Sequence, residues 1–327
     1  MRAPVTIVRS LQAGKTLGFA CEPDGTVRDW PLLNVSYPPL GYLPWRVLEV
    51  GNGDTYGYYW PVGYEDRDPL VCTTEHDVFR VVPIASDLGG CLRLLKATRS
   101  AIASEVREVA REFEVSLSQV RSSATISPDP SLATLDPHSP ELLLAQGREA
   151  MRVGDLTLCE HCAREALAML PEYGSALELL SQLYRRQRRL DDTAQALLDM
   201  ICAPLCFGRG YEARLKSLRA LQRLPDELVS DDDVLWRQRR SLTFRTGVKA
   251  NDDFLLYEEA IAAYLSAGHA RRAVWLRMLV GELLALESVS FQERYGWTQE
   301  KHRGDLARDL LAAGFSARLT MLGIGER

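Results

Sequence analysis

The chain has 327 residues, a formal net charge of −5 at pH 7, and 46% hydrophobic and 25% charged residues. This composition is ordinary for a globular protein with buried cores, and its acidic balance argues against a general nucleic-acid binder. No apolar run is long enough to span a bilayer, and the N-terminus lacks the pattern of a secretory signal. We therefore expect a cytoplasmic protein whose seven cysteines are reduced thiols.

The first hundred residues predict short strands separated by turns. "VTIVRSL" and "KTLGFACEPDGTVRDW" alternate apolar and polar residues on either side of turns, as a hairpin does. "WRVLEV", "TYGYYWPV", "PLVCTTE" and "FRVVPIA" follow as strand candidates rich in Val, Tyr and Trp. From Asp87 onward the apolar spacing becomes helical, in "CLRLLKATRSAIASEVREVAREF".

A proline-rich segment, "SPDPSLATLDPHSP", separates these strands from a helical remainder, and Ser139 stands where it would cap the next helix. We expect an α+β domain over 1–98, a helix and linker over 99–138, and an all-α domain of helical hairpins over 139–327. Helices are predicted near 141–153, 156–170, 175–188, 191–203, 211–223, 231–245, 252–267, 270–287 and 299–313.

Aromatic residues and a glycine turn mark the first domain. They comprise Leu43-Pro44-Trp45, the turn Gly51-Asn52-Gly53-Asp54, the aromatic run Tyr56 to Trp60, Glu75-His76-Asp77, and Ile84-Ala85-Ser86 before a helix. This pattern, over residues 32–98, resembles the SUKH superfamily of fungal cell-wall regulators and bacterial immunity proteins. The resemblance implies a partner-binding sheet face, and the residues expected on it are Trp45, Asp54, Tyr56, Tyr58 and Trp60.

The same aromatic side chains have a plainer interpretation. Alternate residues of a strand face opposite sides of the sheet, so some of these rings are expected to pack in the core. Exposed Tyr and Trp anchor protein interfaces well, whereas buried ones only fill space. The sequence leaves both interpretations open.

The segment "ELLLAQGREAMRVGDLTLCEHCAREALAMLPE" resembles a tetratricopeptide repeat. Gly147, the turn Gly154-Asp155-Leu156, Cys159, Ala166 and Pro171 fall at the offsets of that repeat. Cys159 then takes the place of an alanine where two helices cross. The following segments 175–201 and 258–280 match the repeat weakly.

Four cysteines of the helical region allow a second interpretation. Cys159 and Cys162 form a Cys-x-x-Cys pair, and Cys202 and Cys206 are candidates for completing a tetrahedral zinc site. Zinc ligand pairs usually lie on tight turns, whereas this pair lies within a predicted helix. We therefore expect packing rather than metal binding, and no cofactor.

Arginines recur on the first helix of each of the first two predicted hairpins. Arg148, Arg152, Arg185 and Arg186 are candidates for lining one concave groove and binding an acidic peptide, because guanidinium groups hold carboxylates in pairs of hydrogen bonds. The plainer interpretation, which the sequence favours, is that "YRRQRR" is a solvated helix end whose cations are stabilised near the helix C-terminus.

Catalytic motifs are weak. "AGKT" lacks the upstream glycine of a phosphate-binding loop, and no strand–helix crossover follows "GNGDTYG". We therefore expect a non-enzymatic protein that binds a protein partner, neither nucleic acid nor membrane. By resemblance the first hypothesis is an immunity protein that neutralises a toxin. The alternatives are an adaptor that recruits an acidic segment and, less favoured, a zinc-dependent or hydrolytic enzyme.

Overall fold

The computed structural model describes residues 37–44, 54–98, 107, 110–111, 130–229 and 233–320. These residues fall into two compact units. Unit 1 lies within residues 41–171, and unit 2 combines residues 37–40 with 172–320. An antiparallel sheet with helices, followed by a mainly helical region, confirms the predicted fold class.

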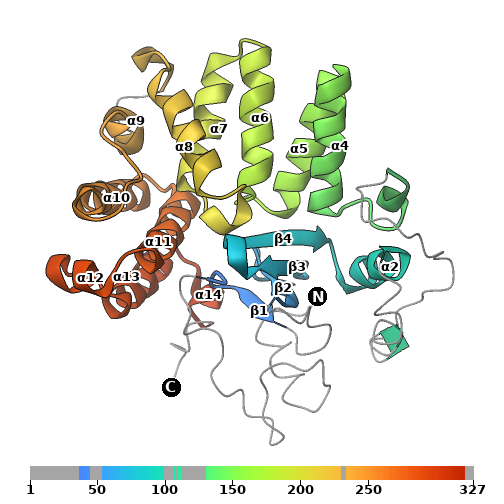
Figure 1. Cartoon of the computed structure of the whole chain (residues 1–327), viewed down its shortest axis with the longest axis horizontal. Coiled ribbons are helices and arrows are strands. Elements are labelled where there is room, and N and C mark those ends of the chain that lie inside the picture. Colours follow the sequence, from blue (N-terminus) through green and yellow to red (C-terminus); the bar gives the residue numbers. More distant parts are fainter. Residues whose placement is uncertain are drawn as a thin grey trace, which may run out of the picture. The chain divides into compact units, whose positions relative to one another are not determined.

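The sheet of unit 1 has four antiparallel strands in chain order (Figure 1): β1 (Tyr42–Pro44), β2 (Tyr56–Tyr59), β3 (Leu70–Glu75) and β4 (Arg80–Ala85). The predicted strands "TYGYYWPV", "PLVCTTE" and "FRVVPIA" contain β2, β3 and β4 and are confirmed. The other strand candidates lie outside the described residues. A single turn of 3-10 helix, η2 (His76–Val78), joins β3 to β4.

Three helices of unit 1 pack on the sheet or on one another, and local capping explains where the second and third of them begin and where the second ends. They are α2 (Leu88–Thr98), which packs against β3 and β4, α4 (Pro140–Val153), which packs against β4, and α5 (Leu156–Met169), which packs against α4. Ser139 caps α4 by accepting the N–H of Leu142, as predicted. Gly154 ends α4 in the left-handed conformation (φ 88°), and Asp155 caps α5. A short 3-10 turn, η4 (Pro130–Thr134), precedes α4.

Unit 2 is built from helices joined by short turns. Its elements are α6 (Gly174–Arg186), α7 (Leu190–Cys202), η5 (Leu205–Phe207), α8 (Tyr211–Gln222), η6 (Asp226–Leu228), α9 (Val234–Gln238), α10 (Val248–Ser266), α11 (Ala270–Ala285), α12 (Val289–Tyr295), α13 (Gln299–Ala312) and α14 (Ser316–Thr320). Most begin and end close to the predicted ranges. The sequence did not predict α12 and α14.

The helix predicted over 231–245 is wrong beyond Gln238, where α9 ends. The chain then forms a loop in which Phe244 has a positive φ of 50°. The buried carboxylate of Asp253 holds this loop by accepting the backbone N–H groups of Thr243 and Phe244. A contact from the next helix therefore overrides the local helical pattern.

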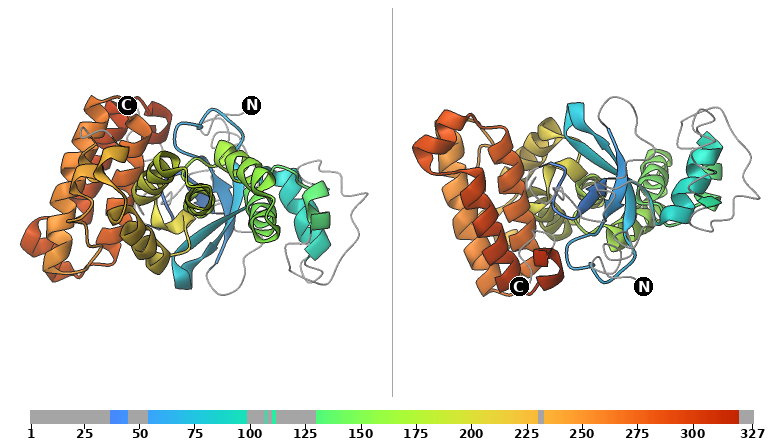
Figure 2. Two further views of the ribbon diagram at one scale, coloured as in Figure 1. Left: turned by 90° about the horizontal axis from the view of Figure 1, so that it is seen from above. Right: turned by 90° about the horizontal axis from the view of Figure 1, so that it is seen from below.

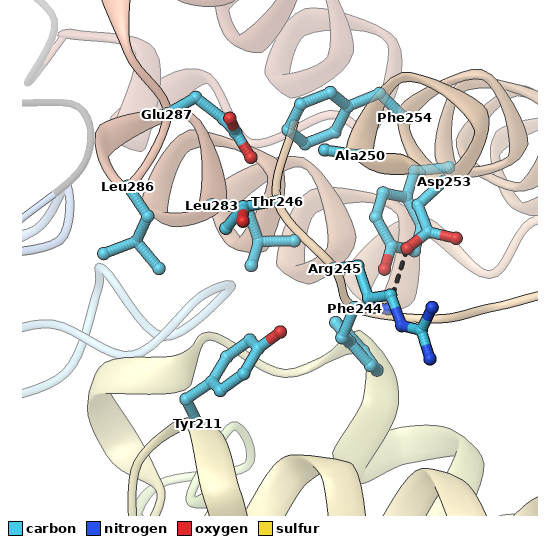
Figure 3. A pocket seen from close by; sticks show the side chains of 11 residues that line it. Tyr211, Phe244, Arg245, Thr246, Ala250, Asp253, Phe254, Leu283, Leu286 and Glu287 are labelled. Atoms are coloured by element: carbon cyan, nitrogen blue, oxygen red, sulfur yellow. Dashed lines mark hydrogen bonds between the residues drawn. The ribbon is translucent and has the colours of Figure 1, made fainter. Parts of the chain in front are cut away.

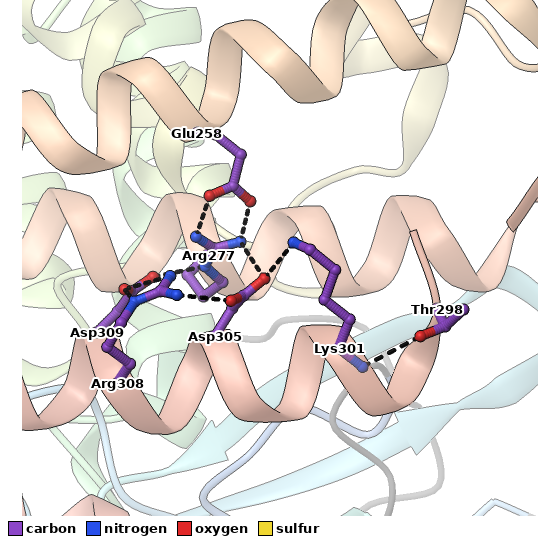
Figure 4. Close-up of polar contacts among 7 residues, drawn as sticks. All are labelled: Glu258, Arg277, Thr298, Lys301, Asp305, Arg308 and Asp309. Atoms are coloured by element: carbon purple, nitrogen blue, oxygen red, sulfur yellow. Dashed lines mark hydrogen bonds and ion pairs between the residues drawn. The ribbon is translucent and has the colours of Figure 1, made fainter. Parts of the chain in front are cut away.

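The C-terminal helices pack around one buried cation. In both views of Figure 2 the orange and red helices run beside one another, and α11 packs against both α10 and α13. Figure 4 shows Arg277 of α11 between carboxylates of its two neighbours. Arg277 pairs with both oxygens of Glu258 and donates to Asp309 over 2.6 Å. This network joins three helices through charge-assisted hydrogen bonds.

None of the described helices is both long and apolar enough to cross a membrane.

Candidate functional site

A groove of about 560 Å³ runs over α6, α7 and α8 of unit 2. α7 lies between α6 and α8 and packs against both (Figure 1). The lining residues are Glu178, Ser181, Gln182 and Arg185 of α6, Thr193 and Leu197 of α7, and Lys216, Ser217, Arg219, Ala220, Arg223 and Leu224 on and just after α8.

Cations dominate the groove. Arg185, Lys216, Arg219 and Arg223 are all exposed, and none of them forms an ion pair with another described residue. Glu178 is the single acidic side chain among the lining residues. Four unneutralised cations beside one carboxylate make a positive patch on a protein whose net charge is −5, and such a patch attracts anions.

The three hydroxyl groups that line the groove donate hydrogen bonds to backbone carbonyls three or four residues earlier in the chain. Ser181 donates to the carbonyl of Glu178 over 2.8 Å, and Thr193 donates to that of Arg189 over 2.8 Å. Ser217 donates to the carbonyl of Ala213 over 3.1 Å. A nucleophilic hydroxyl needs an adjacent base, and no histidine occurs among the described lining residues. What the groove offers a ligand is therefore mainly its cationic side chains.

The four arginines that the sequence assigned to one groove belong to two different units. Arg185 lines the groove of unit 2, whereas its neighbour Arg186 is exposed outside it. Arg148 and Arg152 lie on α4 of unit 1, where Arg152 pairs with Glu149 of the same helix over 2.5 Å. Of the four, only Arg185 belongs to the described groove.

Sequence reasoning missed the three cations of the other wall. Lys216, Arg219 and Arg223 recur at spacings of three and four residues, which places them on one face of a helix. The helix itself was predicted over 211–223. The spacing of these three basic residues within the predicted helix was the available signal.

The aromatic residues predicted on a binding face are instead in the core of unit 1. Tyr56, Tyr58 and Trp60 are 2%, 8% and 1% exposed. Buried rings cannot act as contact anchors on the surface of the unit, and this placement favours the packing interpretation. Trp45 lies outside the described residues.

Asp54 has a local structural role. Its carboxylate accepts the backbone N–H of His76 over 2.7 Å and lies 2.9 Å from the ring Nδ1 of the same residue. This hydrogen bond raises the pKa of His76 above its ordinary value. Asp54 therefore ties the start of β2 to the turn after β3.

The four candidate metal ligands are buried thiols. Cys159 and Cys162 lie on α5, and Cys202 and Cys206 lie in unit 2, each at most 2% exposed. Burial raises the pKa of Cys159 to about 11 and that of Cys202 to about 12. Among the described residues no group of three or more His, Cys, Asp or Glu is placed to hold a metal ion.

A second pocket, shown in Figure 3, is much smaller. It offers about 20 Å³ beside the loop between α9 and α10, room for about one water molecule. Its two carboxylates are engaged, since Asp253 accepts from Phe244 over 2.8 Å and Glu287 accepts from Gly247 over 3.1 Å. Both carboxylates of the pocket therefore hold the loop between α9 and α10 in place.

Comparisons with known proteins match two parts of the chain. Residues 30–102 match the family described as the YfbP N-terminal domain, and residues 245–318 match the YfbP C-terminal domain. The uncharacterized protein YfbP of Escherichia coli (strain K12) is 25% identical over 270 residues, which cover 82% of this chain and 86% of that protein. No solved structure matches the chain.

These matches overturn both resemblances drawn from the sequence. The YfbP N-terminal match covers the whole segment 32–98 that suggested a SUKH domain, and no SUKH domain or tetratricopeptide repeat is indicated. The physical reason is that both patterns are generic. Aromatic strands around a glycine turn suit many sheets, and a Gly-Asp turn between two helices reflects ordinary capping chemistry.

Proposed function

We propose that this protein is a non-catalytic adaptor whose basic groove binds an acidic segment of a partner protein. The observation that carries the proposal is a set of four cations around one 560 Å³ groove, Arg185, Lys216, Arg219 and Arg223, none of which has an ion-pair partner among the described residues. Guanidinium groups bind carboxylates through paired, charge-assisted hydrogen bonds. A cluster of cations of this kind favours an anionic ligand.

An acidic protein segment fits the groove better than a nucleic acid does. Non-specific single-strand binding combines basic residues with aromatic platforms for the bases, and the described lining residues include no aromatic ring. Leu197 and Leu224 add apolar surface between the charged walls. That combination suits a peptide that carries both carboxylates and apolar side chains.

The immunity hypothesis has lost its support. It depended on the SUKH resemblance, which the family matches overturn. No described feature of unit 1 points to a toxin, so the proposal stays with the adaptor function.

Peptide binding tests the proposal. A fluorescent peptide rich in Glu and Leu is expected to bind, and the same peptide with Gln in place of Glu is not. The double variant Arg219→Gln/Arg223→Gln is expected to bind the acidic peptide about ten-fold more weakly, at roughly 0.7 kcal/mol for each lost charge. Raising the salt concentration should weaken binding to the unmodified protein.

The matched control is Arg237→Gln/Lys249→Gln, which removes two exposed charges of unit 2 outside the groove. Each of these side chains loses only a surface ion pair, with Glu259 and Asp252 respectively. Equal affinities for the acidic and Gln peptides, or equal losses in the groove and control variants, would refute the proposal.

A further inference from the structure

The two charged walls of the groove run in the same direction. Gly174, at the start of α6, lies so close to Gly208 that a Cβ on it would be 3.3 Å from the Gly208 Cα. Arg209, just before α8, lies 3.9 Å from Glu178. The N-terminal ends of α6 and α8 are therefore adjacent, and the later residues of both helices share the other end of the groove.

This arrangement polarises the groove. Glu178 lies near the N-terminal end, and Arg185 lies two turns further along α6, about 10 Å away by helical rise. Arg219 of α8 and Arg223, just after α8, lie towards the same far end. Three guanidinium groups thus gather at one end, while the other end holds a carboxylate together with Lys216.

Among the described residues Glu178 forms one ion pair, and that pair is long. Its side chain is 15% exposed, and its cationic neighbour Arg209 is 58% exposed and only at the limit of ion-pair distance. Its other polar contact is the amide of Gln182, which donates over 3.2 Å. A ligand carboxylate beside Glu178 would therefore meet a like charge that is only 15% exposed, so water screens the repulsion less than it does between fully exposed groups.

We propose that Glu178 is a specificity-determining residue that makes the groove select segments acidic at one end only. The arginine end, formed by Arg185, Arg219 and Arg223, holds the acidic part of the segment. The Glu178 end accepts uncharged or basic residues and disfavours further acids. This inference rests on the proposed function and specifies the charge pattern of the partner.

The test uses three labelled ten-residue peptides without histidine: one acidic throughout, one acidic in its first half and one acidic in its second half, with Gln at the other positions. The protein is expected to bind one of the half-acidic peptides at least as tightly as the fully acidic one. Which half-acidic peptide binds more tightly reports the direction of the bound chain.

Glu178→Gln should strengthen binding of the fully acidic peptide by about five- to ten-fold, because it removes a like charge while keeping the size of the side chain. It should leave the preferred half-acidic peptide within two-fold or so. Glu212→Gln is the matched control, since Glu212 is exposed on α8 but does not line the groove. Melting temperatures should be equal for all three proteins.

The outcomes separate the two proposals. If none of the peptides binds, the adaptor function fails and this inference fails with it. In a second case acidic peptides bind, but Glu178→Gln changes all affinities by the same factor, or by no more than Glu212→Gln does. Peptide binding by the groove is then supported, and the proposed role of Glu178 is refuted.

Discussion

Asp136 accepts two hydrogen bonds from Ser86, one from its backbone N–H and one from its hydroxyl, each 2.7 Å long. The carboxylate is 2% exposed and also accepts the backbone N–H of His138 over 3.3 Å. It therefore pins the segment before α4 to the turn between β4 and α2.

Replacing Asp136 with Ala is expected to lower the free energy of unfolding by about 2–4 kcal/mol, because buried donors lose their acceptor. Urea denaturation measures the change. Asp66→Ala is the control, since Asp66 is exposed and its loss should cost no more than about 0.5 kcal/mol. Similar losses for the two variants would contradict the pinning role.

Arg277 is expected to be the most sensitive side chain of the C-terminal helices. Arg277→Met leaves Asp309, whose side chain is 3% exposed, without its buried cation. Breaking such a buried pair costs about 3–5 kcal/mol. Thermal or chemical unfolding of the variant measures this loss.

Arg308→Met provides the comparison. Arg308 pairs with Asp305 and Asp309 from the surface, with 61% of its side chain exposed. A solvent-exposed pair contributes about 0–1 kcal/mol. If Arg308→Met destabilises as much as Arg277→Met, burial is not the cause.

The buried carboxyl group of Glu282 is expected to make the free energy of unfolding depend on pH. Its buried carboxylate accepts the backbone N–H groups of Leu205 and Cys206. Burial raises its pKa to about 7. The folded state thus binds this proton more tightly than the unfolded state does, so the contribution to stability is full below pH 4.5 and is lost as the pH rises through 7.

Glu282→Gln removes this titration. The stability difference between the unmodified protein and the variant should therefore shrink as the pH rises from 5 to 8. Urea denaturation at several pH values gives the difference. A difference that stays constant across this range would show that Glu282 does not titrate there.

His302 is expected to affect the pH dependence of stability in the opposite sense, by lowering stability at acidic pH. Its ring is 2% exposed, and neither ring nitrogen has a hydrogen-bond partner among the described residues. Burial lowers its pKa to about 3. The unfolded state takes up this proton first, so stability is lost as the pH falls from 6.5 towards 3.

His302→Phe keeps a ring of similar shape without the proton site. The variant is expected to be at least as stable as the unmodified protein at pH 7, since a buried polar group without a partner costs about 1–3 kcal/mol. Its advantage should grow as the pH falls to 5. A growing disadvantage would show that the imidazole makes a contact that stabilises the fold.

Local chemistry was predictable from the sequence. The ranges of α4 to α8, the cap at Ser139 and the turn at Gly154-Asp155 all depend on residues within a few positions of one another. The strands β2 to β4 followed from alternation and β-branched content. Family membership did not follow, because the same local chemistry occurs in many unrelated folds.

What the sequence alone determined, then, is where most of the helices and strands form, since their hydrogen bonds and apolar periodicity are local. The tertiary structure decided which side chains meet. Arg185 and Arg223 are 38 positions apart and line one groove only because α6 and α8 pack on opposite sides of α7. Tyr56 and Tyr58 are core residues because all four residues of β2, on both of its faces, are buried. Such placements depend on long-range packing, which helical or strand periodicity does not encode.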